Sequence, residues 1–255
     1  MSAPVRFVGA GPGAADLLTV RAARLLAEAD VVLYPGSYLD PEVLAHCCAT
    51  AELVDTAELD LDVIVARIVA AQQAGLRVVR LVSGDPSLYS ALSEQTRRLD
   101  ALGVPWDITP GVPAYAAAAA VLGRELTVPL VAQSVVLTRV QAASTAMPQR
   151  EALAAFAATG ATLALHLAIT RTRELMAELE SDYGASCPVA VVYRASQPDE
   201  LVLRGTIADI ADAVEAAGLR QAALILVGRA IADLPDPCAG ESHLYDAARD
   251  RSGPD

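Results

Sequence analysis

The sequence predicts an α/β protein with two sheets, a mostly parallel one in the N-terminal half and a mixed one in the C-terminal half. Short apolar runs alternate with amphipathic stretches up to residue 109, which is the pattern of parallel strands covered by helices. The turn Thr109–Pro113 then breaks this rhythm and is a candidate domain boundary. Further on, apolar runs at 189–193 and 201–206 have only a short turn between them. That turn is too short for a helical crossover, so we expect these two strands to pair antiparallel.

The N-terminal half alternates strands and helices. Apolar runs such as Val31–Tyr34 are typical of strands that are buried on both faces. Apolar residues recur at helical spacing between 61 and 69, and Gly75 is a typical helix end, so we expect an amphipathic helix there. The expected strands are 5–9, 31–34, 52–55, 78–82 and 106–109. The expected helices are 19–29, 41–47, 61–74 and 87–102.

The C-terminal half begins with an alanine-rich helix at 114–122. The strands expected after it are 134–139, 162–167, 189–193, 201–206 and 223–227, with helices at 150–158, 171–179 and 207–217. From Asp233 the composition becomes polar and rich in proline, which is typical of a surface tail. We therefore expect an N-terminal α/β domain at 1–112, a C-terminal α/β domain at 113–232 and a surface tail at 233–255.

The composition excludes several classes of function. With 255 residues, of which 54% are hydrophobic, the chain can bury a large core. Its net charge of -12 argues against a nucleic-acid partner, because such a partner favours a clustered basic surface. The chain contains no lysine, which excludes a Walker A phosphate site and a pyridoxal Schiff base, since both need the lysine amine.

Neither a membrane segment nor a leader peptide is expected. The longest apolar run, 112–123, ends at Arg124 and is shorter than the ~20 residues of a membrane helix. A strand begins by Val5, which leaves no room for a signal peptide. We therefore expect a cytoplasmic protein with no membrane partner. The four cysteines show no CxxC spacing, so we expect reduced thiols and no metal site.

A glycine-rich turn follows the first strand. Gly9, Gly11 and Ala14 fit the dinucleotide-binding pattern G-x-G-x-x-[GA], and such glycines let a ligand approach the backbone closely. Two features argue against a dinucleotide. The helix is expected to begin only near Thr19, too late for its N-terminus to meet a pyrophosphate, and the second strand runs into Pro35–Ser37 instead of an acidic residue for the ribose. The sequence therefore disfavours a nicotinamide or flavin oxidoreductase.

Two other turns lie at the carboxyl ends of predicted strands. Ser83–Pro86 follows strand 78–82, and Thr109–Val112 follows strand 106–109. Asp85 alone could simply cap a helix that begins at Pro86. Open α/β sheets bind ligands at the carboxyl ends of their strands, however. Together with the glycine turn, these two turns predict a common ligand-binding edge.

This set of motifs, in this order, resembles the tetrapyrrole (corrin/porphyrin) methylase family from Val5 to about Ala232. The matching stretches are Val8–Gly13, Asp16–Thr19, Ala29–Tyr34, Ser83–Pro86, Pro110–Val112, Pro188–Tyr193 and Ala223–Gly228. The resemblance implies the fold of that family, with two α/β domains and the active-site cleft between them. It also implies a homodimer.

Three stretches resemble, within the family, the methylases that act at ring position 11 of a corrin precursor in cobalamin biosynthesis. They are Tyr34–Leu39, Gln133–Arg139 and Tyr193–Glu200. The chain departs from the family pattern at two places. Gln141–Ser144 stands where those methylases usually have a Glu-Gly-Arg-Thr type of loop, and Pro113 replaces a threonine, which removes one hydroxyl from the cofactor contacts.

The resemblance implies methyl transfer from S-adenosyl-L-methionine to a ring carbon of a small-molecule tetrapyrrole substrate, with S-adenosyl-L-homocysteine as product. A sulfonium methyl is already electrophilic, so we expect positioning, which can lower a barrier by about 7–11 kcal/mol, and we assign no catalytic residue. Tyr34 and Tyr89 are expected to pack on the macrocycle, and Arg139 to bind its carboxylates. The implied cofactor contacts are Pro12, Ser83, Gly84, Asp85, Leu88, Pro113, Ala114, Leu167, Ala195 and Ala223.

Other functions remain open at this point. A member of the same superfamily could methylate another ring position, a cobalt-bearing precursor, or a substrate such as diphthine or ribosomal RNA. From another class, the chain could be a non-catalytic nucleotide-binding regulatory subunit. That last alternative predicts no tight binding of S-adenosylhomocysteine.

Overall fold

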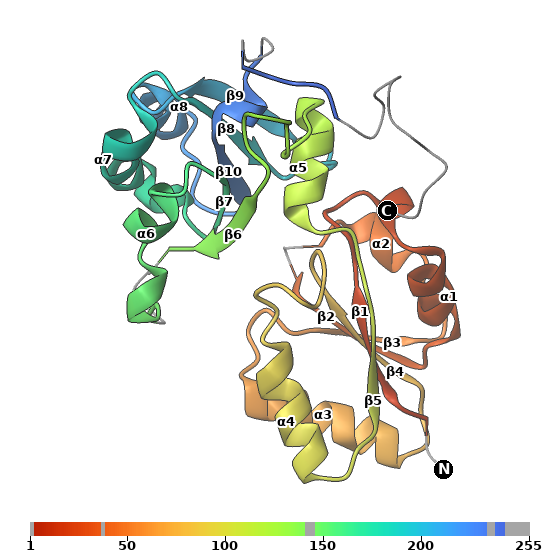
Figure 1. The fold of residues 1–255 in the computed structure, drawn as a ribbon. Helices are drawn as coiled ribbons and strands as arrows, with labels where there is room; N and C mark the ends of the chain where they lie inside the picture. Colours follow the sequence, from red (N-terminus) through yellow and green to blue (C-terminus); the bar gives the residue numbers. More distant parts are fainter. Residues whose placement is uncertain (1–2, 37–38, 141–145, 234–237, 243–255) are drawn as a thin grey trace, which may run out of the picture. The chain divides into compact units, whose positions relative to one another are not determined.

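The computed structural model describes residues 3–36, 39–140, 146–233 and 238–242. The chain divides into two compact units (Figure 1). Unit 1 consists of residues 1–117 and 194–200, and unit 2 consists of residues 118–193 and 201–255. Unit 1 therefore contains a short segment, 194–200, that the domain division expected from the sequence placed in the C-terminal domain.

Unit 1 is built on a five-stranded sheet in the order β3-β2-β4-β1-β5, in which all neighbours are parallel. This confirms the parallel sheet predicted from the alternation of strands and helices. The strands are β1 (Val5–Gly9), β2 (Val31–Tyr34), β3 (Glu52–Asp55), β4 (Val78–Val82) and β5 (Trp106–Thr109). The helices are α1 (Val20–Glu28), α2 (Pro41–Leu44), α3 (Leu61–Gln73) and α4 (Leu92–Ala101), and a 3-10 turn, η1 (Ala15–Leu17), precedes α1.

Helices cover both faces of this sheet (Figure 1). Leu26 of α1 and Val43 of α2 belong to a buried cluster that also includes Val8 of β1. Ile68 of α3 belongs to a second cluster, which Phe7 joins from the same strand. Consecutive residues of β1 thus enter different clusters, because side chains alternate between the two faces of a strand. Burial on both faces explains the continuous apolar runs of the sequence.

Helix α4 begins five residues later than the sequence predicts. The expected start at 87 is wrong, because Tyr89 and Ala91 have φ angles of 52° and 54° and cannot continue a right-handed helix. The Ser90 hydroxyl also donates to the Pro86 carbonyl at 2.5 Å. Serine side chains that bond to nearby backbone groups in this way stabilise turns at the expense of helix.

Unit 2 contains a mixed five-stranded sheet in the order β6-β7-β10-β8-β9. Only β6 and β7 are parallel, and the hairpin of β8 and β9 is antiparallel, as predicted. The strands are β6 (Val135–Arg139), β7 (Thr162–His166), β8 (Pro188–Tyr193), β9 (Leu201–Thr206) and β10 (Ala223–Val227). The helices are α6 (Leu153–Ala157), α7 (Thr172–Tyr183) and α8 (Ile210–Ala216), with 3-10 turns η3 (Gln149–Glu151), η4 (Ile169–Arg171) and η5 (Arg229–Ile231).

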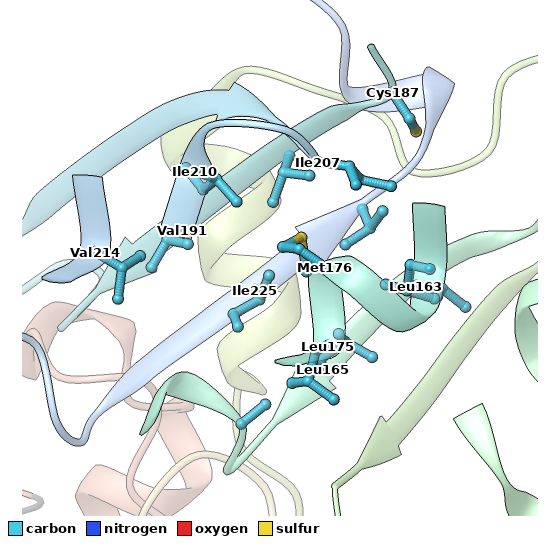
Figure 2. Packing of buried hydrophobic residues seen from close by; sticks show 14 of the residues in the cluster. Leu163, Leu165, Leu175, Met176, Cys187, Val191, Ile207, Ile210, Val214 and Ile225 are labelled. Atoms are coloured by element: carbon cyan, nitrogen blue, oxygen red, sulfur yellow. The ribbon is translucent and has the colours of Figure 1, made fainter. Parts of the chain in front are cut away.

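The core of unit 2 lies between its sheet and helices α7 and α8 (Figure 2). Leu165 and Ile225 from neighbouring strands face Leu175 of α7, and Val214 contributes from α8. Helix α5 (Ala114–Leu122) begins in the residues of unit 1 and ends in those of unit 2. The expected surface tail at 233–255 lies largely outside the described residues. No helix in the described part of the chain is long and apolar enough to cross a membrane.

The two ends of α1 provide a matched test of this packing. Leu26 is fully buried, whereas Val20 on the same helix is 77% exposed. We expect Leu26→Ala to lower the free energy of unfolding by about 2–5 kcal/mol, because it leaves a cavity between α1 and the sheet. Val20→Ala should change it by less than about 0.5 kcal/mol. Urea unfolding of both variants checks this, and equal effects would contradict the packing described for α1.

Candidate cofactor site

Three turns meet at the carboxyl edge of the sheet in unit 1. Strand β1 lies between β4 and β5, with Gly9 beside Val82 and Val8 beside Thr109. The turns that follow these strands are therefore neighbours, as the sequence analysis predicts. Gly11 and Gly84 exchange two backbone hydrogen bonds, of 3.1 Å from the Gly11 N–H and 2.8 Å from the Gly84 N–H. These bonds tie the glycine turn to the Ser83–Pro86 turn.

The backbones of three glycines touch at this edge. A Cβ atom at Gly9 would lie 2.5 Å from the Gly111 nitrogen and 2.7 Å from the Gly84 oxygen. A Cβ atom at Gly111 would lie 2.2 Å from the same Gly84 oxygen. We call Gly9, Gly84 and Gly111 the glycine junction. From the sequence, the glycines were expected to let a ligand approach, whereas Gly9 and Gly111 are required here for packing between turns.

The Asp85 side chain stabilises the glycine junction through hydrogen bonds. Its Oδ2 accepts a 2.8 Å hydrogen bond from the Gly111 N–H, and its Oδ1 accepts from the N–H of Ser87 at 2.8 Å and from the Ser87 hydroxyl. Burial opposes ionisation of this carboxyl, but these hydrogen bonds outweigh it and lower the pKa of Asp85. Asp85 is thus a carboxylate that joins the turn after β4 to the turn after β5. Its part in capping a helix, considered from the sequence, is limited to this turn because α4 begins later.

The turn between Asp85 and α4 carries two predicted residues in a strained backbone. The Leu88 N–H donates to the Asp85 carbonyl at 3.2 Å. Tyr89, which is half exposed, has a positive φ, and so does Ala91. Left-handed conformations of residues other than glycine cost free energy and are concentrated at functional sites. Leu88 and Tyr89 therefore lie on a strained turn that follows Asp85 directly in the chain.

Residues 194–200 complete the site of unit 1. The Ser196 hydroxyl accepts a 3.1 Å hydrogen bond from the Ala14 N–H, and the Gln197 Nε2 donates to the Pro12 carbonyl at 3.2 Å. The Gln197 side chain fills the space that a Cβ at Gly13 would occupy. Ala195, which is buried here, is the only residue of this segment that was predicted as a cofactor contact. Ser196 and Gln197 were not among the predicted site residues, because the segment between the two strands was interpreted only as a short turn. The similarity of Tyr193–Glu200 to the family was the signal that could have identified them.

Gln197 also presents a buried acceptor. The residue is 9% exposed, and its Oε1 has no hydrogen-bond partner among the described residues. The bond from Nε2 to Pro12 fixes which end of the amide is the oxygen. A buried oxygen without a donor costs free energy, so this position suits a donor group of a bound ligand.

The late helix start predicted after the glycine turn is confirmed. Helix α1 begins at Val20, and the Thr19 hydroxyl caps it by accepting from the Ala22 N–H at 3.0 Å. The turn η1 lies between the glycine turn and this helix. Pro12 and Gly13 therefore meet the side chain of Gln197 and not a helix N-terminus, which is unlike a dinucleotide site.

The remaining predicted residues of unit 1 are near these turns in the chain. Pro113 and Ala114 follow the glycine junction, and a Cβ at Gly84 would be 3.9 Å from each of them. Tyr34 ends β2, and its carbonyl accepts from the N–H and the hydroxyl of Thr56, both at 2.9 Å. All of these turns belong to the carboxyl edge of one sheet. The departure predicted at Gln141–Ser144 lies outside the described residues.

In unit 2, the structure gathers Arg139, Leu167 and Ala223 at one edge of the sheet. Arg139 ends β6 beside His166, Leu167 follows β7 with φ 53° and 66% exposure, and Ala223 begins β10, which is antiparallel to β7. The Arg139 Nη2 donates to the Ala146 carbonyl at 3.3 Å. Burial lowers the pKa of His166 to about 4, so its imidazole is neutral at physiological pH. No group of three potential metal ligands occurs among the residues that the structure describes.

Comparison with known proteins identifies the family. The chain matches the model of the Tetrapyrrole (Corrin/Porphyrin) Methylases over residues 4–211, and it belongs to this family. The resemblance seen in the sequence is thereby confirmed, and so is the predicted α/β fold with one parallel and one mixed sheet.

Individual relatives are similar over nearly their full length. Precorrin-4 C(11)-methyltransferase from Rhodococcus erythropolis is 54% identical over 248 residues, which cover 97% of this chain and 98% of the relative. An X-ray structure of a cobalt precorrin-4 methyltransferase has a TM-score of 0.87 at 39% identity, covering 90% of this chain and 96% of that one. A structure of uroporphyrin-III C-methyltransferase from Thermus thermophilus, complexed with S-adenosylhomocysteine, has a TM-score of 0.74 at 29% identity. The match covers 90% of this chain and 93% of that one.

The charge of Asp85 predicts a pH-dependent stability. Asp85→Asn should lower the free energy of unfolding at pH 7 by about 1–3 kcal/mol, because an amide cannot accept all the hydrogen bonds that the carboxylate accepts. The pKa of Asp85 is lowered in the fold, so this stabilisation is complete above the ordinary value of 3.8 and is lost as the pH falls through the folded value. The difference in the free energy of unfolding between wild type and Asp85→Asn should therefore be constant near neutral pH. It should become smaller below pH 3.8.

Urea unfolding across this pH range measures the difference. Asp16→Asn is the control, because Asp16 is exposed and lies outside these turns. A difference for Asp85→Asn that stayed the same down to the lowest pH would show that the carboxylate charge does not hold the junction.

Proposed function

We propose that this chain is an S-adenosylmethionine-dependent methyltransferase that methylates C11 of precorrin-4 to give precorrin-5 in cobalamin biosynthesis. The identity of 54% to the precorrin-4 C(11)-methyltransferase of Rhodococcus erythropolis, over nearly all of both chains, carries this proposal. The three stretches that resemble methylases acting at ring position 11 support it.

The features of unit 1 fit the cofactor. Backbone groups of the Ser83–Pro86 turn and the buried Gln197 Oε1 offer hydrogen-bonding positions, and small or apolar residues such as Pro12, Pro113 and Ala195 suit packing against a nucleoside. A related structure is described as a complex with S-adenosylhomocysteine. The cofactor would supply an electrophilic methyl group on its sulfonium. The protein's part is then to bind and orient, for which hydrogen-bonded turns are suited.

The proposed substrate is a polycarboxylate, whereas the protein carries a net charge of -12. Local arginine must therefore provide the attraction. Arg139 is the proposed carboxylate ligand, and Tyr34 and Tyr89 are proposed to pack against the macrocycle. A cobalt-bearing precursor is the second candidate substrate, because the structural relative with a TM-score of 0.87 is a cobalt precorrin-4 methyltransferase. The homodimer and the cytoplasmic location expected from the sequence belong to the same proposal.

The activity is tested directly with purified protein, S-adenosylmethionine and precorrin-4. We expect a product heavier by one methyl group and a stoichiometric amount of S-adenosylhomocysteine, both measured by mass spectrometry. A parallel reaction with cobalt-precorrin-4 compares the two substrates by kcat/KM. Binding of S-adenosylhomocysteine without methylation of either substrate would overturn the proposed reaction, and the absence of that binding would favour the non-catalytic alternative.

The role of Arg139 predicts a change in substrate affinity alone. Arg139→Gln should raise the KM for precorrin-4 about tenfold, the effect of losing one charge-assisted hydrogen bond to a carboxylate. The Kd of S-adenosylhomocysteine, measured by calorimetry, should stay within about twofold. Arg220→Gln, an exposed arginine of the same unit, is the control and should change neither constant. An unchanged KM in Arg139→Gln would remove Arg139 from the substrate site.

A further inference from the structure

Arg80 is a buried charge that the proposed function does not yet use. Strand β4 is the central strand of the sheet in unit 1 (Figure 1). In this strand Arg80 lies beside Phe7 of β1 and Leu33 of β2, and it is 7% exposed. Arginine is almost never fully buried unless it is paired. Among the described residues, however, Arg80 forms no ion pair, and its hydrogen bonds all go to uncharged oxygens. Burial lowers the pKa of Arg80 to about 10, so the side chain keeps its charge at neutral pH.

Besides the carbonyl of the adjacent Leu81, to which Nη1 donates at 3.4 Å, the guanidinium binds two side chains. Its Nε donates to the Gln95 Oε1 at 3.1 Å, and its Nη1 donates to the Thr56 Oγ1 at 3.1 Å. Both partners are themselves buried. An apolar side chain could occupy this position without desolvating a charge. The planar fork of arginine is what allows one side chain to bind both oxygens at fixed directions.

Thr56 and Gln95 each form a further hydrogen bond to a segment of the candidate site. The Thr56 hydroxyl donates to the Tyr34 carbonyl, which ends β2. The Gln95 Nε2 donates to the Ala91 carbonyl at 3.1 Å and the Ser90 carbonyl at 3.4 Å. The second segment is the strained turn that carries Leu88 and Tyr89. Both carbonyls lie at the start of α4, so the Gln95 side chain ties the helix to the turn that precedes it.

We propose that Arg80 is a positioning residue of the candidate site, whose guanidinium holds the end of β2 through Thr56 and the turn before α4 through Gln95. This inference rests on the proposed function for its kinetic consequence only. Arg80 itself is not proposed to contact either ligand. It sets the places of two segments that carry proposed substrate and cofactor contacts.

Amide hydrogen exchange tests the two arms of Arg80 separately, namely its hydrogen bonds to Thr56 and to Gln95. The amide of Thr56 donates to Tyr34, and the amide of Gln95 donates to Ala91. We expect Thr56→Val to speed exchange at position 56 about tenfold without affecting position 95, and Gln95→Met to do the reverse. Arg80→Met should speed exchange at both positions. Ile68→Ala is the control, because Ile68 is fully buried in the same unit. This substitution should destabilise unit 1 without a specific increase of exchange at positions 56 and 95.

Kinetics then separate a positioning role from a structural one. Arg80→Met should lower kcat/KM about 10²-fold, the effect of a small misplacement of binding groups. Arg80→Lys should not restore it, because an ammonium group cannot bind both oxygens as the planar fork does. Thr56→Val should raise the KM for precorrin-4 about tenfold and leave the Kd of S-adenosylhomocysteine unchanged, whereas Gln95→Met should weaken S-adenosylhomocysteine binding.

Several results would overturn the inference. One is the same exchange pattern and the same kcat/KM in Arg80→Met and Ile68→Ala, and another is full activity in Arg80→Lys. If Arg80→Met does not fold, Thr56→Val and Gln95→Met still decide, because each removes one arm only. If wild type methylates neither substrate, the proposed function fails, while the exchange pattern still reports whether Arg80 holds both segments.

Discussion

The candidate cofactor site depends on the close approach of three backbones at the glycine junction. Gly84 presents its carbonyl to positions 9 and 111, where a Cβ atom would overlap it. The separation between the ends of β1, β4 and β5 is therefore set by the absence of side chains. Contacts of backbone with backbone leave little room for adjustment, because interiors are packed as closely as molecular crystals. For a reaction that depends on aligning two reactants, such a rigid support is an advantage.

Two charged side chains fix this region without forming ion pairs within the described part of the chain. Asp85 is held by N–H and O–H donors, and Arg80 is held by neutral oxygens. Hydrogen bonds to a charged group are stronger than those between neutral groups and are directional. Each charge therefore sets the direction of several neighbours at once. Asp85 acts between the turns after β4 and β5, and Arg80 acts between the end of β2 and the turn before α4.

Much of the fold could be predicted from the sequence, because the burial of parallel strands leaves apolar runs that are visible locally. The shared edge of the three turns followed from the same pattern. The start of α4 could not be predicted, since the left-handed conformations of Tyr89 and Ala91 have no signature in those residue types. The role of Gln197 could not be predicted from local patterns either, although the family resemblance of its segment marked that segment. It depends on a hydrogen bond to a residue 185 positions away, and local patterns contain no such information. Arg80 likewise looked like one residue of a strand.

The return of residues 194–200 to unit 1 has a consequence for how the protein is made. The sheet of unit 1 is complete once β5 has left the ribosome, but the Pro12 carbonyl and the Ala14 amide receive their partners only when Ser196 and Gln197 have been synthesised. Domains generally fold as units during synthesis, beginning at the N-terminus. In this chain, the nascent first unit carries an unfinished glycine turn while β6 to β8 are still being translated. A fragment that ends after α5 would contain the whole sheet of unit 1. Its glycine turn would lack the hydrogen bonds to Ser196 and Gln197.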